Sequence, residues 1–490
     1  MSEHIRSTGA LGISATLLSA TILLGSCSHD STAPPPVAYA LSIVSGAGQS
    51  DTVGAVLALP LVVRVVDAEG HRGAGMVVDF TASAGSGSLS ADSAVTGADG
   101  LAQVQWTLGT SEGEAEVDVT LRGTDAAGVT FLATATPPRL HAVTFSAGLE
   151  HNCAINATHE LYCWGRNEYG QLGDGTVQDR NTAGAVPTPL RFDRVAAGGG
   201  HTCAITTEGE LYCWGHNFWG QIGDGSTVTR MIPVHIEPEL HFADVVAGIE
   251  TTCALTTAGA VYCWGFMDGT QSTTYWDPAD VSSGTLFRSL VAASYQVCGM
   301  GVDGNPYCLI PTWVSGGISG GDGYLWRPQP APLSTFTSFA GGLNFMCGLD
   351  AEGAASCWGN NDYGQLGTGN TDSVAGAVPV SGGYLFHGLF SGYDWSCGVT
   401  AAGPTYCWGQ NAWGVQGPVG SDGVEPTPHQ LPTPAGITFT AMEGGFYHMC
   451  GIGSDTEVYC WGGGFNGQLG NGHSVADFYH TETPTPVIRR

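Results

Sequence analysis

The sequence predicts an all-β protein, and three observations support this prediction. The 490 residues include 75 glycines with no collagen-like triplet period, which indicates many tight turns and therefore many short strands. Short β-branched runs are common, whereas long segments with apolar residues at helical spacing are hard to find. Because 43% of the residues are hydrophobic, the chain is expected to be folded, and its length allows more than one core.

The net charge restricts the class of partner. The chain has 43 acidic and 14 basic side chains, for a formal net charge of −29. Such a field repels DNA and RNA and disfavours peripheral binding to anionic lipid. Proteins with basic patches, neutral glycans and cations remain as partners. The alternative is that the charge serves solubility alone.

The first 27 residues have the layout of a secretory signal peptide. The apolar run Gly9–Gly25 is short for a membrane span and follows a polar segment with one basic residue, Arg6. We therefore expect the protein to be exported.

The end of this run resembles the lipobox of bacterial lipoproteins. Its residues are Leu24-Gly25-Ser26-Cys27, and the resemblance implies cleavage before Cys27 and acylation of that cysteine. The alternative is an ordinary signal peptide with a chance cysteine. Residues 28–37 are polar and Pro-rich, which predicts a flexible tether. Because Ser28 rather than Asp follows the cysteine, we expect a cell-envelope protein anchored in the outer membrane.

The other fourteen cysteines form seven pairs, and the two members of each pair are 10 residues apart. The pairs are Cys153 and Cys163, Cys203 and Cys213, Cys253 and Cys263, Cys298 and Cys308, Cys347 and Cys357, Cys397 and Cys407, and Cys450 and Cys460. Metal sites favour much closer cysteine spacing, so this spacing argues against zinc.

The spacing fits a hairpin closed by a disulfide. Pairing Cys203 with Cys213 leaves the three-residue loop Thr207–Gly209, whose last residue must adopt a left-handed conformation that suits glycine. Glycine recurs there at Gly259, Gly304, Gly353 and Gly403, while His159 and Thr456 are exceptions. Buried free thiols are the alternative, but directly opposed residues and an oxidising compartment favour disulfides.

A similar amino-acid sequence surrounds each of the seven cysteine pairs. The first cysteines recur at intervals of 45 to 53 residues, and self-similarity at this period indicates a solenoid or a propeller. Each unit supplies about four short strands: an apolar strand such as Val245–Ala247, two cysteine strands, and a strand near a proline such as Pro233-Val234. Seven four-stranded units suit closure into a ring.

Three recurring fragments, G-x-x-H-x-C-A-I, G-x-L-Y-C-W-G and N-x-x-G-Q-L-G, resemble those of the regulator of chromosome condensation repeat family. The resemblance implies a seven-bladed β-propeller over residues 141–490. The third unit departs from the pattern at Gly269–Ser272, and the fourth has Leu309 in place of Trp. We expect elaborated loops around Thr273–Gly284 and Trp313–Trp326.

The repeat register also predicts how the ring closes. The chain enters the repeats at the strand Ala142–Ala147 and leaves them on Pro484–Val487, which resembles the Pro-Val strand of the other units. We expect this tail to complete the sheet that opens at residue 142.

Residues 38–136 predict a separate β-sandwich without cysteines. The predicted strands are Ala58–Val66, Met76–Ala82, Leu101–Leu108 and Glu116–Leu121. This region resembles bacterial Ig-like domains of the invasin/intimin class in the segments VVRVVDAEG, VVDFTASAG and ADGLAQVQWTLG. The resemblance implies that the sandwich serves as a spacer.

The sequence contains no specific catalytic set. It has neither a G-x-S-x-G elbow nor an H-E-x-x-H pair, so we predict a protein that is not an enzyme and has no cofactor and no bound metal. His151, His201 and His448 share one repeat position. They are close enough in the predicted ring to suggest a metal, but bracing each blade is the favoured role.

Two repeat positions vary within the chain, as a binding surface allows and a packing position does not. The first is Glu150, Gly200, Glu250, Tyr295, Asn344, Asp394 and Tyr447; the second is Tyr169, Trp219, Tyr363, Trp413 and Asn466. Exposed Trp and Tyr make good interface anchors, although they are equally suited to capping each blade.

The favoured hypothesis is a monomeric envelope lipoprotein for display or adhesion, whose propeller binds an extracellular or periplasmic protein or glycan. One alternative is a propeller hydrolase or lyase that uses Glu150, Glu250 and Asp394 on one face. Another is an inhibitor resembling the secreted propeller inhibitor of β-lactamases, and a purely structural role is a third. Nucleotide exchange on a small GTPase, the activity of the family's namesake, conflicts with export.

Overall fold

The computed structural model describes residues 37–266, 274–293, 296–314, 323–330, 336–418, 423–473 and 479–490. The chain divides into two compact units, the first ending at Ala135 and the second beginning at Thr136. All regular elements of the described residues are β-strands, which confirms the all-β prediction. Among these residues there is no helix of the length and hydropathy that a bilayer crossing needs.

The first unit consists of short strands in two main sheets, ordered β1-β3-β7 and β2-β10-β9-β4-β6, and a two-stranded sheet β5-β8. The strands are β1 (Tyr39–Ser45), β2 (Gln49–Thr52), β3 (Leu61–Asp67), β4 (Val77–Ala82), β5 (Ser88–Leu89), β6 (Ser93–Val95), β7 (Leu101–Val104), β8 (Trp106–Thr107), β9 (Gly113–Leu121) and β10 (Val129–Thr136).

One apolar core joins the two main sheets of this unit. Val63 of β3 packs in the same buried cluster as Val117 of β9 and Phe131 of β10. The predicted strand Leu101–Leu108 is broken at Gln105, because β7 pairs with β3 whereas β8 pairs with β5. The chain therefore changes sheets within a segment that has one continuous apolar pattern.

The second unit contains seven four-stranded antiparallel sheets, each made of four strands consecutive in the chain. They are β11 (Thr144–Ala147), β12 (His151–Ile155), β13 (Leu161–Gly165) and β14 (Arg180–Ala185); β15 (Phe192–Ala197), β16 (His201–Thr206), β17 (Leu211–Gly215) and β18 (Arg230–Ile236); β19 (Phe242–Ala247), β20 (Thr251–Thr256), β21 (Val261–Phe266) and β22 (Thr274–Asp280); β23 (Phe287–Ala293), β24 (Gln296–Gly301), β25 (Pro306–Val314) and β26 (Gly323–Pro330); β27 (Ser338–Gly342), β28 (Phe345–Leu349), β29 (Ala355–Gly359) and β30 (Val374–Pro379); β31 (Phe386–Ser391), β32 (Trp395–Thr400), β33 (Thr405–Gln410) and β34 (Val424–Gln430); and β35 (Phe439–Gly444), β36 (His448–Gly453), β37 (Val458–Gly463) and β38 (His480–Pro486).

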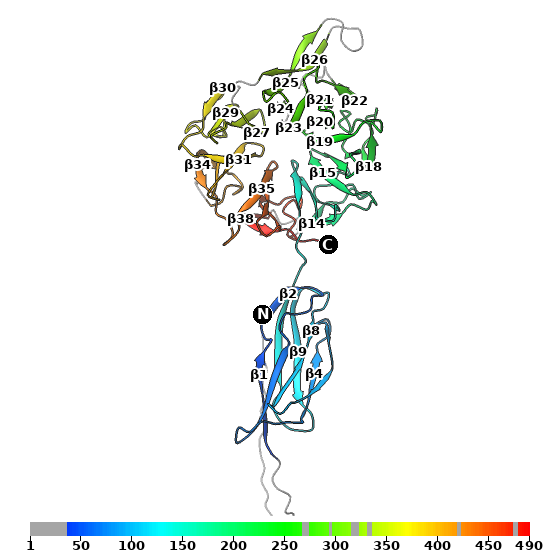
Figure 1. Ribbon diagram of the computed structural model, residues 1–490, viewed down its shortest axis with the longest axis vertical. Coiled ribbons are helices and arrows are strands. Elements are labelled where there is room, and N and C mark those ends of the chain that lie inside the picture. Colours follow the sequence, from blue (N-terminus) through cyan, green and yellow to red (C-terminus); the bar gives the residue numbers. More distant parts are fainter. Residues whose placement is uncertain are drawn as a thin grey trace, which may run out of the picture. The chain divides into compact units, whose positions relative to one another are not determined.

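These sheets form a ring (Figure 1). The first strand of each sheet contacts the first strand of the next, and β35 of the last sheet contacts β11 of the first. The first strands therefore surround the axis, and the fourth strands form the outer rim. This is the architecture of a β-propeller.

The ring closes differently from the prediction. Strand β38 pairs with β37 of its own sheet, with Pro486 opposite Tyr459, so the expectation that Pro484–Val487 completes the sheet opened at residue 142 is wrong. Each unit begins with its apolar strand, and all four strands of every sheet are therefore contiguous in the chain. The C-terminal residues still connect the last sheet to the first. The Val487 carbonyl accepts a hydrogen bond from the Leu140 N–H (2.9 Å), and the Ile488 carbonyl accepts one from the Ala183 N–H (2.8 Å).

The seven predicted cysteine pairs are disulfide bonds, one in each sheet. The predicted register is confirmed, with Cys203 opposite Cys213 and Ala204 opposite Tyr212. The last residue of the loop between the second and third strands has a positive φ, both at Gly209 (86°) and at the exceptions His159 (61°) and Thr456 (69°).

The two segments expected to be elaborated have different structures. Residues 274–280 form β22, an ordinary fourth strand, so an elaborated loop is wrong for that stretch; Gly269–Ser272 lies outside the described residues. In the next sheet β25 and β26 are paired as far as Val314 and Gly323. This hairpin extends beyond the ring (Figure 1).

Candidate binding face

Two kinds of turn open on the same side of the ring. Adjacent strands are antiparallel, so the first and third strands of a sheet both end on one side. Glu150 lies in the turn after the first strand of its sheet, and Tyr169 lies in the loop after the third strand. We call this side, with the turns after first strands and the loops after third strands, the loop face. The described members of both predicted sets of variable residues belong to it.

The second set reaches across to the neighbouring sheet. The ring pairs that join one sheet to the next are Tyr169 with His216 (centroids 4.4 Å apart), Trp219 with Phe266 (4.9 Å) and Trp413 with Tyr447 (5.6 Å). At the closing seam, the Asn466 amide donates to Glu150 Oε1 at 3.2 Å. The two variable sets therefore meet at two joints between sheets, through Trp413 with Tyr447 and through Asn466 with Glu150.

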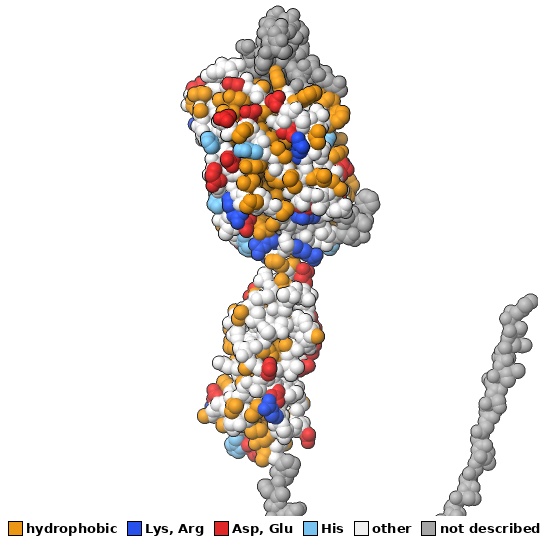
Figure 2. Space-filling model, turned by 90° about the vertical axis from the view of Figure 1, so that its right-hand side faces the viewer, with side chains coloured by type: hydrophobic (Ala, Val, Ile, Leu, Met, Phe, Trp, Pro, Cys, Tyr) orange, Lys and Arg blue, Asp and Glu red, His pale blue; other side chains and the backbone are white. Residues whose placement is uncertain are grey.

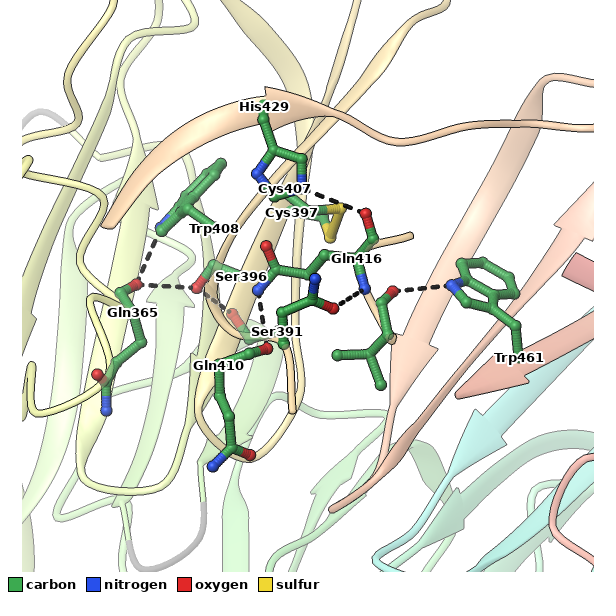
Figure 3. Close-up of a disulfide and its surroundings, with 12 residues drawn as sticks. Gln365, Ser391, Ser396, Cys397, Cys407, Trp408, Gln410, Gln416, His429 and Trp461 are labelled. Atoms are coloured by element: carbon green, nitrogen blue, oxygen red, sulfur yellow. Dashed lines mark hydrogen bonds between the residues drawn. A yellow bond between two sulfur atoms is a disulfide. The ribbon is translucent and has the colours of Figure 1, made fainter. Parts of the chain in front are cut away.

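Buried tryptophans hold the loops that carry this surface (Figure 3). The carbonyl of Gln365 accepts from the Trp408 indole N–H at 2.9 Å and from the Ser396 hydroxyl at 3.3 Å. The same bond runs from Trp164 to Gln468, Trp214 to Gln171, Trp264 to Gln221 and Trp461 to Val415. Each of these indoles belongs to the sheet after the loop it holds. The Leu309 side chain, which stands at this position in the β23–β26 sheet, has no N–H group, so this sheet cannot make the indole hydrogen bond.

A glycine in each loop lets it approach the outer strand of the next sheet. Gly170 has a φ of 75°, and a Cβ there would lie 2.7 Å from the Met231 Cα. A Cβ at Gly220 would likewise lie 2.9 Å from the Trp276 Cα. Met231 and Trp276 are both exposed on their outer strands. Figure 2 shows the surface of the right-hand side of Figure 1, where hydrophobic side chains are mixed with charged ones.

The three acidic candidates lie on the loop face, each bound by its own neighbours. Glu150 pairs with Arg166, and the Gln221 amide donates to Glu250. Asp394 is only 6% exposed, and this burial raises its pKa to about 6. No hydrogen bond links any two of these carboxylates in the described part of the chain.

A continuous aromatic sector covers the β31–β34 and β35–β38 sheets. It consists of Tyr393, Trp413, Phe446, Tyr447 and Phe465, with centroids of neighbouring rings 4.0 to 5.6 Å apart. Sequence reasoning missed Tyr393, Phe446 and Phe465. The first two directly precede the candidates Asp394 and Tyr447, so that repeat position was the available signal.

The remaining candidates have different positions. Tyr363 is 39% exposed, and its N–H donates to Gln365 Oε1 at 2.9 Å. Asn344 is exposed, and its carbonyl accepts from the Asn360 N–H at 2.9 Å. Tyr295 and Cys27 lie outside the described residues.

The three repeat histidines brace the joints between sheets. His151 Nε2 lies 2.8 Å from Thr202 Oγ1, and that hydroxyl donates to the Gln171 carbonyl, so Nε2 carries the proton. His201 bonds Thr252 and His448 bonds Asn152 in the same way, both at 2.8 Å. Burial lowers the pKa of each histidine to about 3, so all three are neutral.

These bonds occupy the Nε2 atom of each histidine. The only group of three potential ligands close together in the described residues is Asp67, Glu69 and His71, on a turn of the first unit. His71 Nδ1 already contacts Asp67 Oδ2 at 3.1 Å within that turn.

Comparison with known proteins agrees with this architecture. The regulator of chromosome condensation (RCC1) repeat matches residues 158–205, 208–255 and 352–381, and a second version of the repeat matches residues 142–171, 192–221, 242–269 and 336–365. The chain therefore contains RCC1 repeats.

Solved structures show the same fold. A chain in the crystal structure of Kap60 bound to yeast RCC1 (Prp20) is 19% identical, with a TM-score of 0.57 over 71% of this chain and 84% of that one. Prp20p from Saccharomyces cerevisiae is 20% identical, with a TM-score of 0.57 over 71% and 87%. The second unit is an RCC1-like β-propeller.

Proposed function

We propose that this chain is a seven-bladed, protein-binding propeller whose loop face recognises its partner, and that it acts by binding rather than by catalysis. The observation that carries this proposal is the connected surface of half-exposed aromatic side chains on loops held by buried indoles. Aromatic side chains are frequent binding hot spots, and loops that are already ordered lose little entropy on association. The fold of Prp20p, a protein with binding properties to Gsp1p and histones, supports a role in protein recognition.

The acidic groups define the chemistry of the partner. Glu150, Glu250 and Asp394 lie on the same face as the aromatic sector, and the whole chain has a net charge of −29. A protein with basic and apolar side chains at its contact surface complements this face. A neutral glycan stacked on the aromatic rings is the competing ligand, and the experiment below distinguishes the two.

The proposal extends to the cell envelope. Residues 1–27 supply the signal and the acylated Cys27, residues 28–37 a tether, and residues 38–136 an Ig-like sandwich that acts as spacer. Seven disulfides in the propeller support an oxidising compartment, since such bonds are rare in the cytosol. Incorporation of labelled palmitate by the wild type, and its loss in Cys27→Ala, tests the anchor; equal labelling of both overturns it.

The binding face is tested with the full chain and matched aromatic substitutions. The double variant Trp413→Ala/Tyr447→Ala changes the aromatic sector, and Trp276→Ala changes an exposed aromatic on the rim. Ligands are captured from envelope fractions and culture fluid, purified, and titrated against each variant.

We expect the double variant to bind a captured protein at least about tenfold more weakly, because hot-spot residues each contribute more than about 1 kcal/mol. Trp276→Ala should bind normally. Equal affinity for the wild type and the double variant, with both folded by circular dichroism, contradicts the loop face as the site. Binding of a glycan without any protein contradicts the proposed partner class.

A further inference from the structure

A channel runs along the axis of the ring. The first strands of the seven sheets line it, and its volume is about 470 Å³. Cavities that bind small molecules have volumes of roughly 300 to 1,000 Å³. The channel is large enough for a ligand, and the proposed binding at the loop face does not use it.

One level of this channel carries a single charge. The residue opposite the first cysteine of each sheet lines the channel, and in the last sheet that residue is Glu443, opposite Cys450. The equivalent residues of the other sheets are Ser146, Ala196, Val246, Val291, Ala340 and Phe390. The carboxylate therefore lies in a ring of small and apolar side chains.

The carboxylate is anchored on one side and open on the other. The Ala147 N–H donates to Glu443 Oε2 at 2.9 Å, and the Ser146 hydroxyl is a second hydrogen-bond partner. Ser146 Oγ itself accepts from the Ala197 N–H at 3.1 Å, which leaves its proton free to donate to the carboxylate. Glu443 is an exposed residue and lines the channel.

Other charged groups near this level do not neutralise Glu443. Arg194 and Asp244 line the channel two residues away along their strands; burial raises the pKa of Asp244, and the positive charge of Arg194 opposes this only in part. His387 of the adjacent β31 lies 3.0 Å from the Val399 carbonyl, and His448 of β36 is neutral. Among the described residues, no ion pair includes Glu443.

We propose that the channel binds a primary ammonium group on an aliphatic chain, with Glu443 as its counter-ion and the apolar ring around its methylene groups. An ammonium is a compact charge that one carboxylate oxygen can bind. A guanidinium is less well matched, because it favours two free oxygens and Ala147 already occupies Oε2. A hard metal ion needs about six oxygen ligands, which this level does not supply.

Two physical effects favour entry of such a cation. The net charge of −29 attracts cations toward the protein. Protein atoms surround the carboxylate within the ring, and this burial raises its pKa to about 7, so the arrival of a positive charge would favour ionisation. The ammonium can belong to a free alkylamine or to a lysine of a protein that enters the channel mouth.

Calorimetric titration of the full chain tests the proposal. The probes are n-pentylamine, its uncharged analogue 1-pentanol, and a blocked tripeptide with a central lysine. We expect the amine to bind and the alcohol not to bind. Glu443→Gln should weaken amine binding at least about tenfold, because a charged hydrogen bond is lost. The Asp244→Asn variant, which lacks the other channel carboxylate, should bind the amine as the wild type does.

The wild type provides a second readout that does not depend on how the variants fold. Because protons compete with the amine for Glu443, binding should weaken as the pH falls from 8 to 6, and binding at pH 7 should release about half a proton. Binding of the peptide without the amine assigns the ammonium to a partner's lysine, and binding of the amine assigns it to a free ligand. Failure of both to bind, or equal amine affinity in Glu443→Gln, overturns the proposal without affecting the loop face.

Discussion

The two compact units of the chain bury their apolar side chains in different ways. The first unit has one cluster that contains Trp106 and Phe131 and draws on both main sheets, and it has no cysteine. In the described part of the second unit, seven smaller clusters are present, and each sheet has one disulfide. Phe242 and Trp264, for example, pack in a cluster with Cys203 of the preceding sheet.

The difference shows how size and repetition change what stabilises a fold. A small unit with a single core depends on every large side chain in that core. In the ring each sheet contacts its neighbours, so the stability is distributed over many joints, as in other repeat proteins. Indole hydrogen bonds and neutral histidines cross these joints in addition to apolar packing, whereas each disulfide links two strands of one sheet.

Low pH should produce the largest difference in stability between the two units. His151, His201 and His448 have a pKa of about 3 in the folded chain and 6.5 as the reference. The unfolded chain therefore takes up protons that the folded chain does not, and stability is lost as the pH falls below 6.5. Between pH 7.5 and 5 each histidine should remove about 2 kcal/mol. Glu443 and Asp394 should offset part of this loss, because their raised pKa values of about 7 and about 6 let the folded propeller take up protons over the same range.

The measurement is calorimetric unfolding of the full chain at several pH values. The first unit contains one histidine among the described residues, the exposed His71, so its transition should move far less. Equal loss of stability in both transitions would contradict the role assigned to the buried histidines.

Truncation of the single core should be the largest point-mutation effect. Trp106 is fully buried, and its indole N–H donates to the Ser86 carbonyl at 2.9 Å. Trp106→Ala should destabilise the first unit by about 3–5 kcal/mol, measured by urea unfolding. The control is Leu132→Ala, at a position that is 42% exposed in the same unit, where we expect a small change. A comparable loss in both variants would argue against one shared core.

Removal of one disulfide should have a smaller effect. Cys203→Ala/Cys213→Ala opens a short hairpin loop, and the chain-entropy estimate for such a loop is about 2.5–3 kcal/mol at most. We expect the propeller transition to shift by no more than this and the transition of the cysteine-free first unit to stay unchanged. A shift of the first transition would indicate that the two units do not unfold independently.

The smallest expected effect is a gain in stability at a hairpin loop. Thr456 has a φ of 69°, which is unfavourable for a β-branched residue, although its hydroxyl lies 3.0 Å from His141 Nδ1. Thr456→Gly should stabilise the propeller by about 0.5 kcal/mol after loss of that contact. Thr207→Gly, in the equivalent loop at a residue without positive φ, should destabilise it slightly. Thermal unfolding measures whether each variant is more or less stable than the wild type. A change in the same direction for both variants would contradict the backbone strain assigned to Thr456.

The features that the sequence predicted well are local. The ten-residue spacing of Cys203 and Cys213 predicted their register, the loop length and the left-handed residue, because hairpin geometry depends only on neighbouring residues. The repeat predicted the four strands of each sheet for the same reason. The expectation for Pro484–Val487 failed because the sheet that a tail joins depends on which strand opens each unit.

The candidate surface was partly predictable. Strand direction alone places the two variable positions on one side of every sheet, so Tyr169 and Glu150 could be expected there. Their partners could not, because contacts such as Trp413 with Tyr447 join different sheets.

The sequence by itself determined the hairpins, the disulfide pairs and the number of repeated units, because these follow from short-range geometry. Only the tertiary structure decided which loops meet, how the last sheet joins the first, and that Glu443 faces a channel. Nothing near Glu443 in the chain distinguishes it from other acidic residues. Its environment exists only because strands from all seven sheets meet around one axis when the ring closes.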